Sequence, residues 1–205
     1  MAKLSDSASQ ANYLELSLAS FLGLVSNGEP APAGGSVAAV AVALAAGLCV
    51  KSARLSASQM SDATDIVAAG EALRDRAISL SQIDAEAYSL VVAAMRRQRG
   101  PDPLERQRAI AAALSHASDV PFEIAEIAAG VSALAARIAE GGNPNLLGDA
   151  VTAALLAESA ARAAAALVGI NLEGVDDDER PSRVAALTEE SARDSARAWR
   201  ARLRG

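Results

Sequence analysis

Aromatic side chains are scarce in this 205-residue sequence, where tryptophan, tyrosine and phenylalanine together make up 2% of the residues. Residues with β-branched side chains seldom alternate with polar ones, so no segment has the pattern of a strand. Alanine dominates instead, and its small side chain lets helices pack closely. These features predict an all-α fold, a single-domain bundle of long antiparallel helices over residues 1–205. Because few large side chains are available to build a thick core, we also expect a homodimer.

Other scarcities limit the partners and the compartment. The single cysteine, Cys49, excludes an internal disulfide and suits a reducing compartment. The net charge of −6, without a basic stripe, argues against nucleic acid as a partner. No His, Cys or carboxylate pair has metal-ligand spacing, so no metal is expected. The first ten residues contain no apolar signal core, and we therefore expect a cytoplasmic protein.

One apolar run raises the question of a membrane. Residues Val37 to Val50 carry no charged side chain before Lys51. This run is shorter than the roughly 20 residues that span a bilayer. We therefore expect a buried core helix and no contact with a membrane.

Glycine and proline divide the rest of the chain into helices. Asn143 can cap the helix that Pro144 begins, and Gly70 is a point where the long third segment could bend. The predicted helices are residues 7–26, 34–58, 62–99, 103–118, one from Pro121, 145–170, and a last one after the acidic loop 173–182.

Asp84 interrupts an apolar helical stripe. Leu80, Ala87 and Val91 recur at helical spacing, and Asp84 falls four residues after Leu80. Tyr88, one turn further on, lies on the same side. Burying an unpaired carboxylate costs several kcal/mol or raises its pKa. Asp84 is therefore either paired with an arginine or a helix N-terminus, or kept for chemistry.

Lys51 is a second charge on an apolar stripe. Leu44, Leu48 and Leu55 share its helical face. Its side chain either extends to solvent near the helix end or sits in a dry cleft, where it could hold an anion or transfer a proton. Asn145 and Asp149 are four residues apart in a later helix, and Asp149 would also favour that helix's N-terminus.

The turn before the second helix is rich in glycine. Gly34 and Gly35 let backbone N–H groups approach a ligand, and Ser36 adds a hydroxyl at a helix start. The same residues could equally form a tight connection between packed helices. Taken alone, this turn leaves both interpretations open.

Taken together, four stretches are similar to the cyclodeaminase/cyclohydrolase family of folate enzymes. In order, they are PAPAGGSVAA (30–39), DAEAYSLVVAAMR (84–96), ERQRAIAAALSHASDVPFEIA (105–125) and GGNPNLLGDAVTAALL (141–156). The resemblance spans about residues 10 to 175. It implies an all-helical, dimeric fold that binds folate in a cleft near the glycine turn. Three positions depart from the family pattern: Ala33 replaces a glycine, Gly148 a serine, and Lys51 an apolar residue, commonly methionine.

The resemblance implies a 5,10-methenyltetrahydrofolate cyclohydrolase, which adds water to the methenyl bridge to give 10-formyltetrahydrofolate. A chain of this length has no room for the transferase domain that normally makes formimidoyl-tetrahydrofolate. The alternatives are a formimidoyltetrahydrofolate cyclodeaminase, which closes the ring and releases ammonia, and a folate-binding helical scaffold without catalysis. No metal or redox cofactor is expected, because hydration of an amidinium transfers no electrons.

The resemblance also suggests roles for particular residues. Asp84 would be the general base, with Tyr88 orienting it or lining the pteridine pocket, and Lys51 would assist the developing oxygen or the departing nitrogen. Arg106 would pair with the glutamate carboxylate of the folate. The remaining expected substrate-binding residues are Gly34, Gly35, Ser36, Asn143, Asn145 and Asp149.

Overall fold

The computed structural model describes residues 12–96 and 103–203, and this part of the chain is helical without strands. The first elements are the 3-10 helix η2 (Tyr13–Glu15) and helices α1 (Leu18–Val25), α2 (Gly34–Arg54) and α3 (Ala63–Arg96). They are followed by α4 (Pro103–Ala117), α5 (Asp119–Gly141), η3 (Pro144–Leu146), α6 (Leu147–Asn171) and α7 (Arg180–Ala201).

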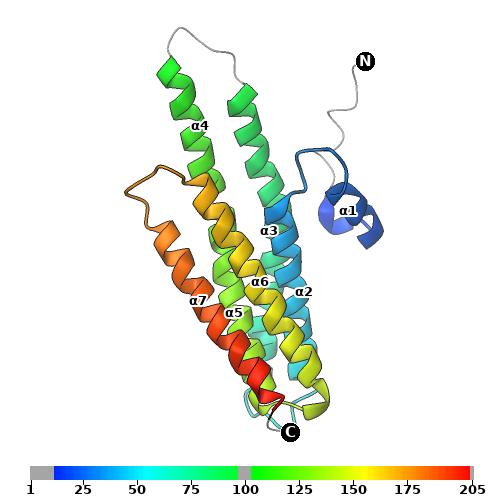
Figure 1. Cartoon of the computed structure of the whole chain (residues 1–205). Coiled ribbons are helices and arrows are strands. Elements are labelled where there is room, and N and C mark those ends of the chain that lie inside the picture. The colour runs from blue at the N-terminus through cyan, green and yellow to red at the C-terminus, as the bar shows by residue number, and fades with distance from the viewer. Residues whose placement is uncertain (1–11, 97–102, 204–205) are drawn as a thin grey trace.

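The long helices form an antiparallel bundle. Helix α2 packs against α3, α5 and α6, and α7 covers α5 and α6. Figure 1 shows α4 and α5 descending almost end to end, while α3 and α4 reach beyond the other helices at one end of the bundle. Helix α1 lies across the outside near that end (Figure 1). The expected all-α bundle is confirmed.

Small side chains form the centre of the bundle. One core cluster draws residues from α2 through α7, and many of its alanines are fully buried. Gly70 shows how closely the helices approach: a Cβ there would lie 2.8 Å from Cγ2 of Val50. Gly70 does not break helix α3, which is a continuous segment of 34 residues. At about 1.5 Å per residue it is roughly 50 Å long.

The predicted first helix is wrong in one respect. Within 12–26, the chain forms η2 and α1 as two short helices, because Ser17 adopts an extended conformation between them. Its side chain accepts a hydrogen bond from the backbone N–H of Ser20, so Ser17 starts a new helix. Residues 7–11 of that prediction, and residues 97–99 of the predicted third helix, lie outside the described residues.

Among the described residues, two helices are long and apolar enough to cross a membrane, namely Gly34–Arg54 and Pro144–Asn171. In their most apolar windows, 61% and 39% of the residues are buried inside the protein. Core helices of soluble proteins have the same length and composition, so this finding is weak evidence for a membrane span.

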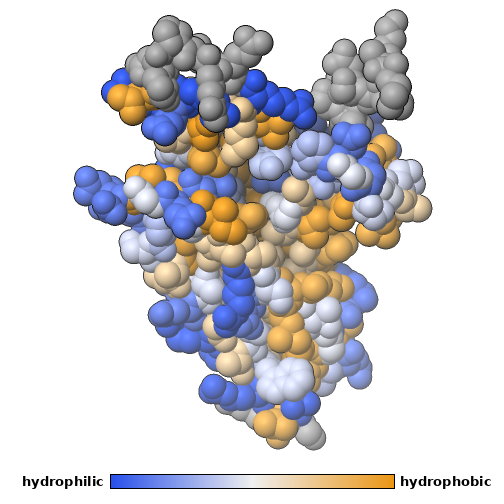
Figure 2. Space-filling view, turned by 45° about the horizontal axis from the view of Figure 1, so that its top comes forward, coloured by the Kyte–Doolittle hydropathy of each residue, from blue (hydrophilic) through white to orange (hydrophobic). Residues whose placement is uncertain are grey.

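The outer face of α2 differs from its inner face. Val37, Leu44 and Leu55 are 40%, 60% and 56% exposed, while the alanines on the opposite side are buried. We call Val37, Ala41, Leu44, Leu48 and the C-cap residue Leu55 the outer stripe of α2; Ala41 and Leu48 in it are half-buried and pack against the core. Figure 2 shows apolar side chains (orange) interspersed with polar ones along the length of the bundle.

Candidate active site

The N-terminus of α2 is capped by a residue of another helix. Ala33 stands at the N-cap position and makes no side-chain hydrogen bond there. Asp84 of α3 replaces the missing cap: its Oδ2 accepts hydrogen bonds from the backbone N–H of Ser36 at 2.8 Å and from Ser36 Oγ at 3.0 Å. A carboxylate at this position also interacts favourably with the positive end of the helix dipole. Of the two partners suggested by the sequence, the structure shows the helix N-terminus.

Gly35 leaves the space that Asp84 occupies. A Cβ on Gly35 would lie 2.0 Å from Asp84 Oδ1 and 2.5 Å from its Cγ. A Cβ on Gly34 would meet only Leu167, at the ordinary contact distance of 3.9 Å. The two glycines are thus different: Gly35 is required by the position of the carboxylate, and Gly34 is not.

The surroundings of Asp84 alter its acidity. Burial raises the pKa of this carboxyl above its usual value, and the two hydrogen bonds from Ser36 partly oppose that rise. Tyr13 is close enough to respond. Its phenol pKa is raised, first by burial and then by the negative charge of Asp84. The two groups therefore lie in one electrostatic environment.

A pocket of about 270 Å³ opens along α3, and we call it the α3 pocket; Ala85 and Tyr88 line it, while Asp84 is not among its lining residues. One wall is formed by η2 and by the loop before α2, and the other by successive turns of α3. Tyr88, 41% exposed, stands in this wall one turn after Asp84. The lining residues are Tyr13, Glu29, Pro30, Ala31, Gln82, Ala85, Glu86, Tyr88, Ser89, Val92, Ala93 and Arg96.

A second group of predicted site residues lies elsewhere. Lys51 Nζ forms a 2.7 Å ion pair with Asp149 Oδ2, and the Lys51 side chain is 56% exposed. Asn143 Oδ1 accepts a hydrogen bond from the backbone N–H of Asn145 at 3.0 Å, so Asn143 caps η3. The Asn143 amide also donates to the backbone oxygen of Leu55 at 3.3 Å.

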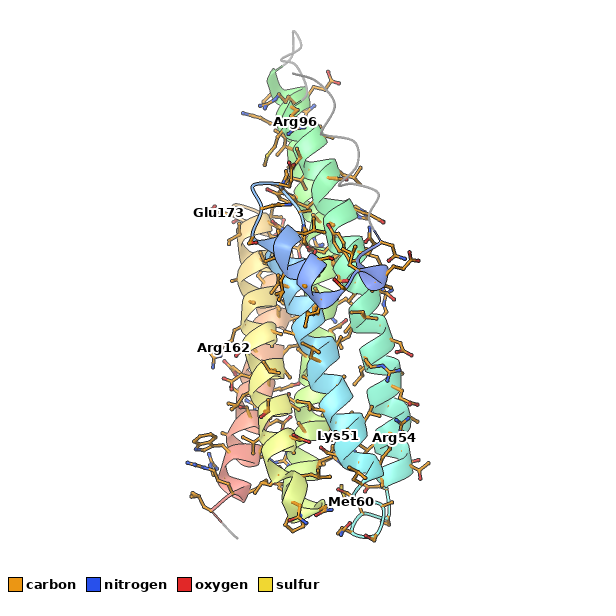
Figure 3. All side chains as sticks on the ribbon, turned by 90° about the vertical axis from the view of Figure 1, so that its right-hand side faces the viewer. Lys51, Arg54, Met60, Arg96, Arg162 and Glu173 are labelled. Atoms are coloured by element: carbon orange, nitrogen blue, oxygen red, sulfur yellow. The ribbon has the colours of Figure 1, made fainter. Side chains whose placement is uncertain are left out.

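The two groups are at opposite ends of α2. Lys51 follows Ser36 by fifteen residues, which corresponds to about 22 Å along a helix. Figure 3 labels Lys51 near one end of the bundle and Arg96 beyond the other. One chain therefore does not place Lys51 in a cleft with Asp84. Their proposed catalytic roles stay predictions.

Arg106 occupies a third place. Its Nη2 donates to the backbone oxygen of Met95 at 2.5 Å, which ties α4 to the end of α3. The donors of Ser36 are likewise engaged, because its backbone N–H and its hydroxyl both donate to Asp84 Oδ2. Binding of folate by Arg106 or by Ser36 stays a prediction.

Sequence reasoning missed part of the α3 pocket. Tyr13, Glu29 and Arg96 all line it and were not predicted. The sequence did contain one usable signal: Gln82, Glu86 and Ser89 are spaced like one polar face of a helix, although it is not the face that carries Asp84. Tyr13 and Glu29 come from a distant segment whose position only the tertiary structure gives.

Two further groups can be placed. In the described ranges 12–96 and 103–203, no three His, Cys, Asp or Glu side chains are arranged to hold a metal ion. Cys49 is buried, and burial raises the pKa of its thiol to about 12. A thiol with that pKa is a poor nucleophile.

Known proteins resemble this chain in sequence and in fold. The model of the formiminotransferase-cyclodeaminase family matches residues 17–190. A methenyltetrahydrofolate cyclohydrolase from Methylorubrum extorquens is 32% identical over 165 residues, which is 77% of this chain and 79% of that protein. The crystal structure of formiminotetrahydrofolate cyclodeaminase from Thermotoga maritima superposes with a TM-score of 0.77 at 24% identity, covering 93% of this chain and 95% of that one.

Proposed function

Because the chain belongs to the formiminotransferase-cyclodeaminase family, we propose that it is an enzyme that hydrolyses 5,10-methenyltetrahydrofolate to 10-formyltetrahydrofolate. The similarity to the Methylorubrum cyclohydrolase supports this reaction over ring closure. The observation that carries the proposal is the position of Asp84, a partly buried carboxylate that is fixed at the N-terminus of α2 and precedes Ala85, a lining residue of the α3 pocket. Capping of α2 alone would not require this group to be a carboxylate, because a serine, threonine or asparagine side chain also caps a helix.

The charge of the substrate explains the use of a carboxylate. The N5–C–N10 bridge of methenyltetrahydrofolate is an amidinium cation, and an anion placed beside it stabilises it. Asp84 Oδ2 accepts both hydrogen bonds from Ser36, while Oδ1 accepts none from the described residues. In our proposal Oδ1 takes the proton from the attacking water.

The bonds change in two steps. Water oxygen bonds to the bridging carbon as its proton passes to Asp84, which gives a neutral tetrahedral adduct. The bond from carbon to N5 then breaks as N5 takes up the proton held by Asp84, the hydroxyl of the adduct loses its own proton to solvent, and the carbon becomes the formyl group on N10. Tyr88 lines the side of the pocket next to Asp84 and would contact the pteridine. No electrons are transferred, so we propose no redox cofactor.

We further propose that the protein is a homodimer formed through the outer stripe of α2. A two-fold axis through Leu44 would place the partner's Lys51 opposite Val37, because Lys51 and Val37 are both seven residues from Leu44. The partner's ammonium would then reach the end of α2 that holds Asp84. This contact would bury exposed leucine side chains and join the two groups of predicted site residues.

In the proposed dimer, the end of the bundle that carries Lys51 would place further polar groups near Asp84 of the other subunit. Asp149 pairs with Lys51, and Asn143 and Asn145 belong to the same end of the bundle. In the dimer these groups could bind the donor and acceptor edge of the pteridine. We also propose a cytoplasmic location, which suits a folate enzyme with one buried cysteine.

The test is the loss of methenyl absorbance on adding the purified protein to methenyltetrahydrofolate. We expect Asp84→Asn to fold normally, since the amide oxygen can still accept from Ser36, and to lower kcat about 10²-fold or more. Asp75→Asn, an exposed change on the same helix, is the control.

Two results would contradict the proposal. Unchanged turnover by Asp84→Asn would remove Asp84 from the mechanism and leave its capping role alone. Release of ammonia from formimidoyltetrahydrofolate, without hydrolysis of the methenyl compound, would identify a cyclodeaminase. Lys51→Met tests the partner's contribution. An unchanged rate of methenyltetrahydrofolate hydrolysis would show that Lys51 has no part in the mechanism.

A further inference from the structure

The α3 pocket is elongated along its helix. Its lining residues on α3 recur every three or four positions from Gln82 to Arg96, so they share one helical face over about four turns. Fourteen residues of helix correspond to about 21 Å. Tyr13 marks the end near Asp84, since its backbone N–H donates to Gln82 Oε1 at 3.2 Å. Arg96 marks the other end.

The chemistry of the lining changes along this length. Gln82 and Glu86, near Asp84, offer oxygen acceptors. Val92 and Ala93 make the following turn mostly apolar. Arg96 is the one cation among the described residues that line the pocket. It forms no hydrogen bond or ion pair with another residue in the described part of the chain.

A folate has the same order of groups. Its pterin presents N–H donors, its aminobenzoyl ring is flat and apolar, and its glutamate tail carries carboxylates. We infer that folate lies lengthwise in the α3 pocket, with the pterin at Gln82 and Glu86 and the glutamate carboxylate paired with Arg96. This inference rests on the proposed function for the substrate, and it makes Arg96 a determinant of specificity.

Arg96 suits this role better than Arg106. The guanidinium of Arg106 is turned to the end of α3, where it donates to the backbone oxygen of Met95. The guanidinium of Arg96 is exposed at the pocket rim. Arginine binds carboxylates through two parallel hydrogen bonds, a geometry that a surface lysine does not reproduce.

The experiment compares two substrates and several variants. Methenyltetrahydrofolate carries the glutamate, and methenyltetrahydropteroate lacks it. We expect Arg96→Met to raise KM for the first about tenfold or more with kcat unchanged, because the tail is bound equally before and during reaction. We expect no change in KM for the second. Arg96→Lys should recover only part of the affinity, and Arg108→Met, an exposed change on α4, should behave as the unmodified protein.

Binding without turnover separates this inference from the proposed function. Calorimetric titration with tetrahydrofolate and tetrahydropteroate reads the contribution of the tail directly. Equal Kd values for the unmodified protein and Arg96→Met, or an equal loss with both ligands, would overturn the role of Arg96. Absence of methenyl hydrolysis, with the Arg96 effect on binding intact, would contradict only the proposed reaction.

Discussion

At the scale of single residues, Asp84 combines a structural and a proposed chemical role. Oδ2 closes the N-terminus of α2, and Oδ1 lies against Gly35. A cap contributed by a distant helix fixes the carboxylate more firmly than a surface position would. The same two hydrogen bonds limit how far burial can raise its pKa. Each neighbour of Asp84 therefore offers a separate way to alter the site.

Gly35→Ala should lower catalytic activity strongly while leaving the stability of the fold nearly unchanged. The new Cβ would overlap the Asp84 carboxylate, which is the end of a side chain and can rotate away. We expect kcat to fall about 10²-fold, the loss assigned to a missing general base. Gly169→Ala, where a Cβ meets nothing within 4 Å, is the control. Circular dichroism and thermal melting show whether the fold persists, and full turnover by Gly35→Ala would contradict the assigned position of the base.

Ser36→Ala should move the pH profile. Removing the hydroxyl takes away a hydrogen bond that lowers the pKa of Asp84, so that pKa rises further. Since a general base must be ionised, the acidic limb of kcat/KM should shift to higher pH. An unmoved limb would show that another group titrates.

The same pKa has a consequence for stability. The folded-state pKa of Asp84 lies above the unfolded value, so the folded protein retains this proton where the unfolded chain has lost it. The contribution of Asp84 to stability is therefore most favourable at low pH. It is lost as the pH rises through the folded-state pKa.

At the scale of helices, one connection depends on a close backbone contact. A Cβ on Gly142 would lie 2.6 Å from the backbone oxygen of Ile138 and 2.9 Å from Ser56 Oγ. Ser56 Oγ also accepts from the backbone N–H of Asn143 at 2.9 Å. This hydroxyl therefore joins the end of α2 to the connection between α5 and η3.

Gly142→Ala should destabilise the protein by about 1–3 kcal/mol, because backbone and not a flexible side chain must move. Gly141→Ala is a matched control one residue earlier, where a Cβ meets nothing within 4 Å. That change should be neutral or slightly stabilising. Urea denaturation of both variants measures the difference, and equal midpoints would show that the connection relaxes freely.

The sequence predicts the helices well and their orientation less well. Glycine and proline mark most helix ends, and the stripe of Leu80, Ala87 and Val91 is buried as expected. Helix α2 is different, because its residues are apolar on nearly every face. Periodicity alone cannot tell which face packs inward. The alanines face the core, where close packing needs small side chains, and Leu44 points outward.

At the scale of the whole molecule, the site could be predicted only in part. Asp84 was identifiable as a charge on a buried stripe. Lys51 gave a similar signal, but the leucine stripe that carries it is the outer one. Sequence spacing records faces of helices and not distances between their ends. The separation of Lys51 from Asp84, and the contribution of Tyr13 to the pocket, therefore required the tertiary structure.

Leu44→Glu should separate the subunits and lower activity together. A residue on a two-fold axis faces its own copy, so the substitution would bury two carboxylates against each other. We expect light scattering to change from dimer to monomer mass, with unchanged helicity. Turnover should fall because a lone subunit has no Lys51 near Asp84. Val175→Glu adds a carboxylate to another exposed apolar residue, 45% exposed and outside α2, and should stay dimeric and active. A Leu44→Glu variant of unchanged mass would place the interface elsewhere, and a fully active monomer would show that Asp84 works without the partner's lysine.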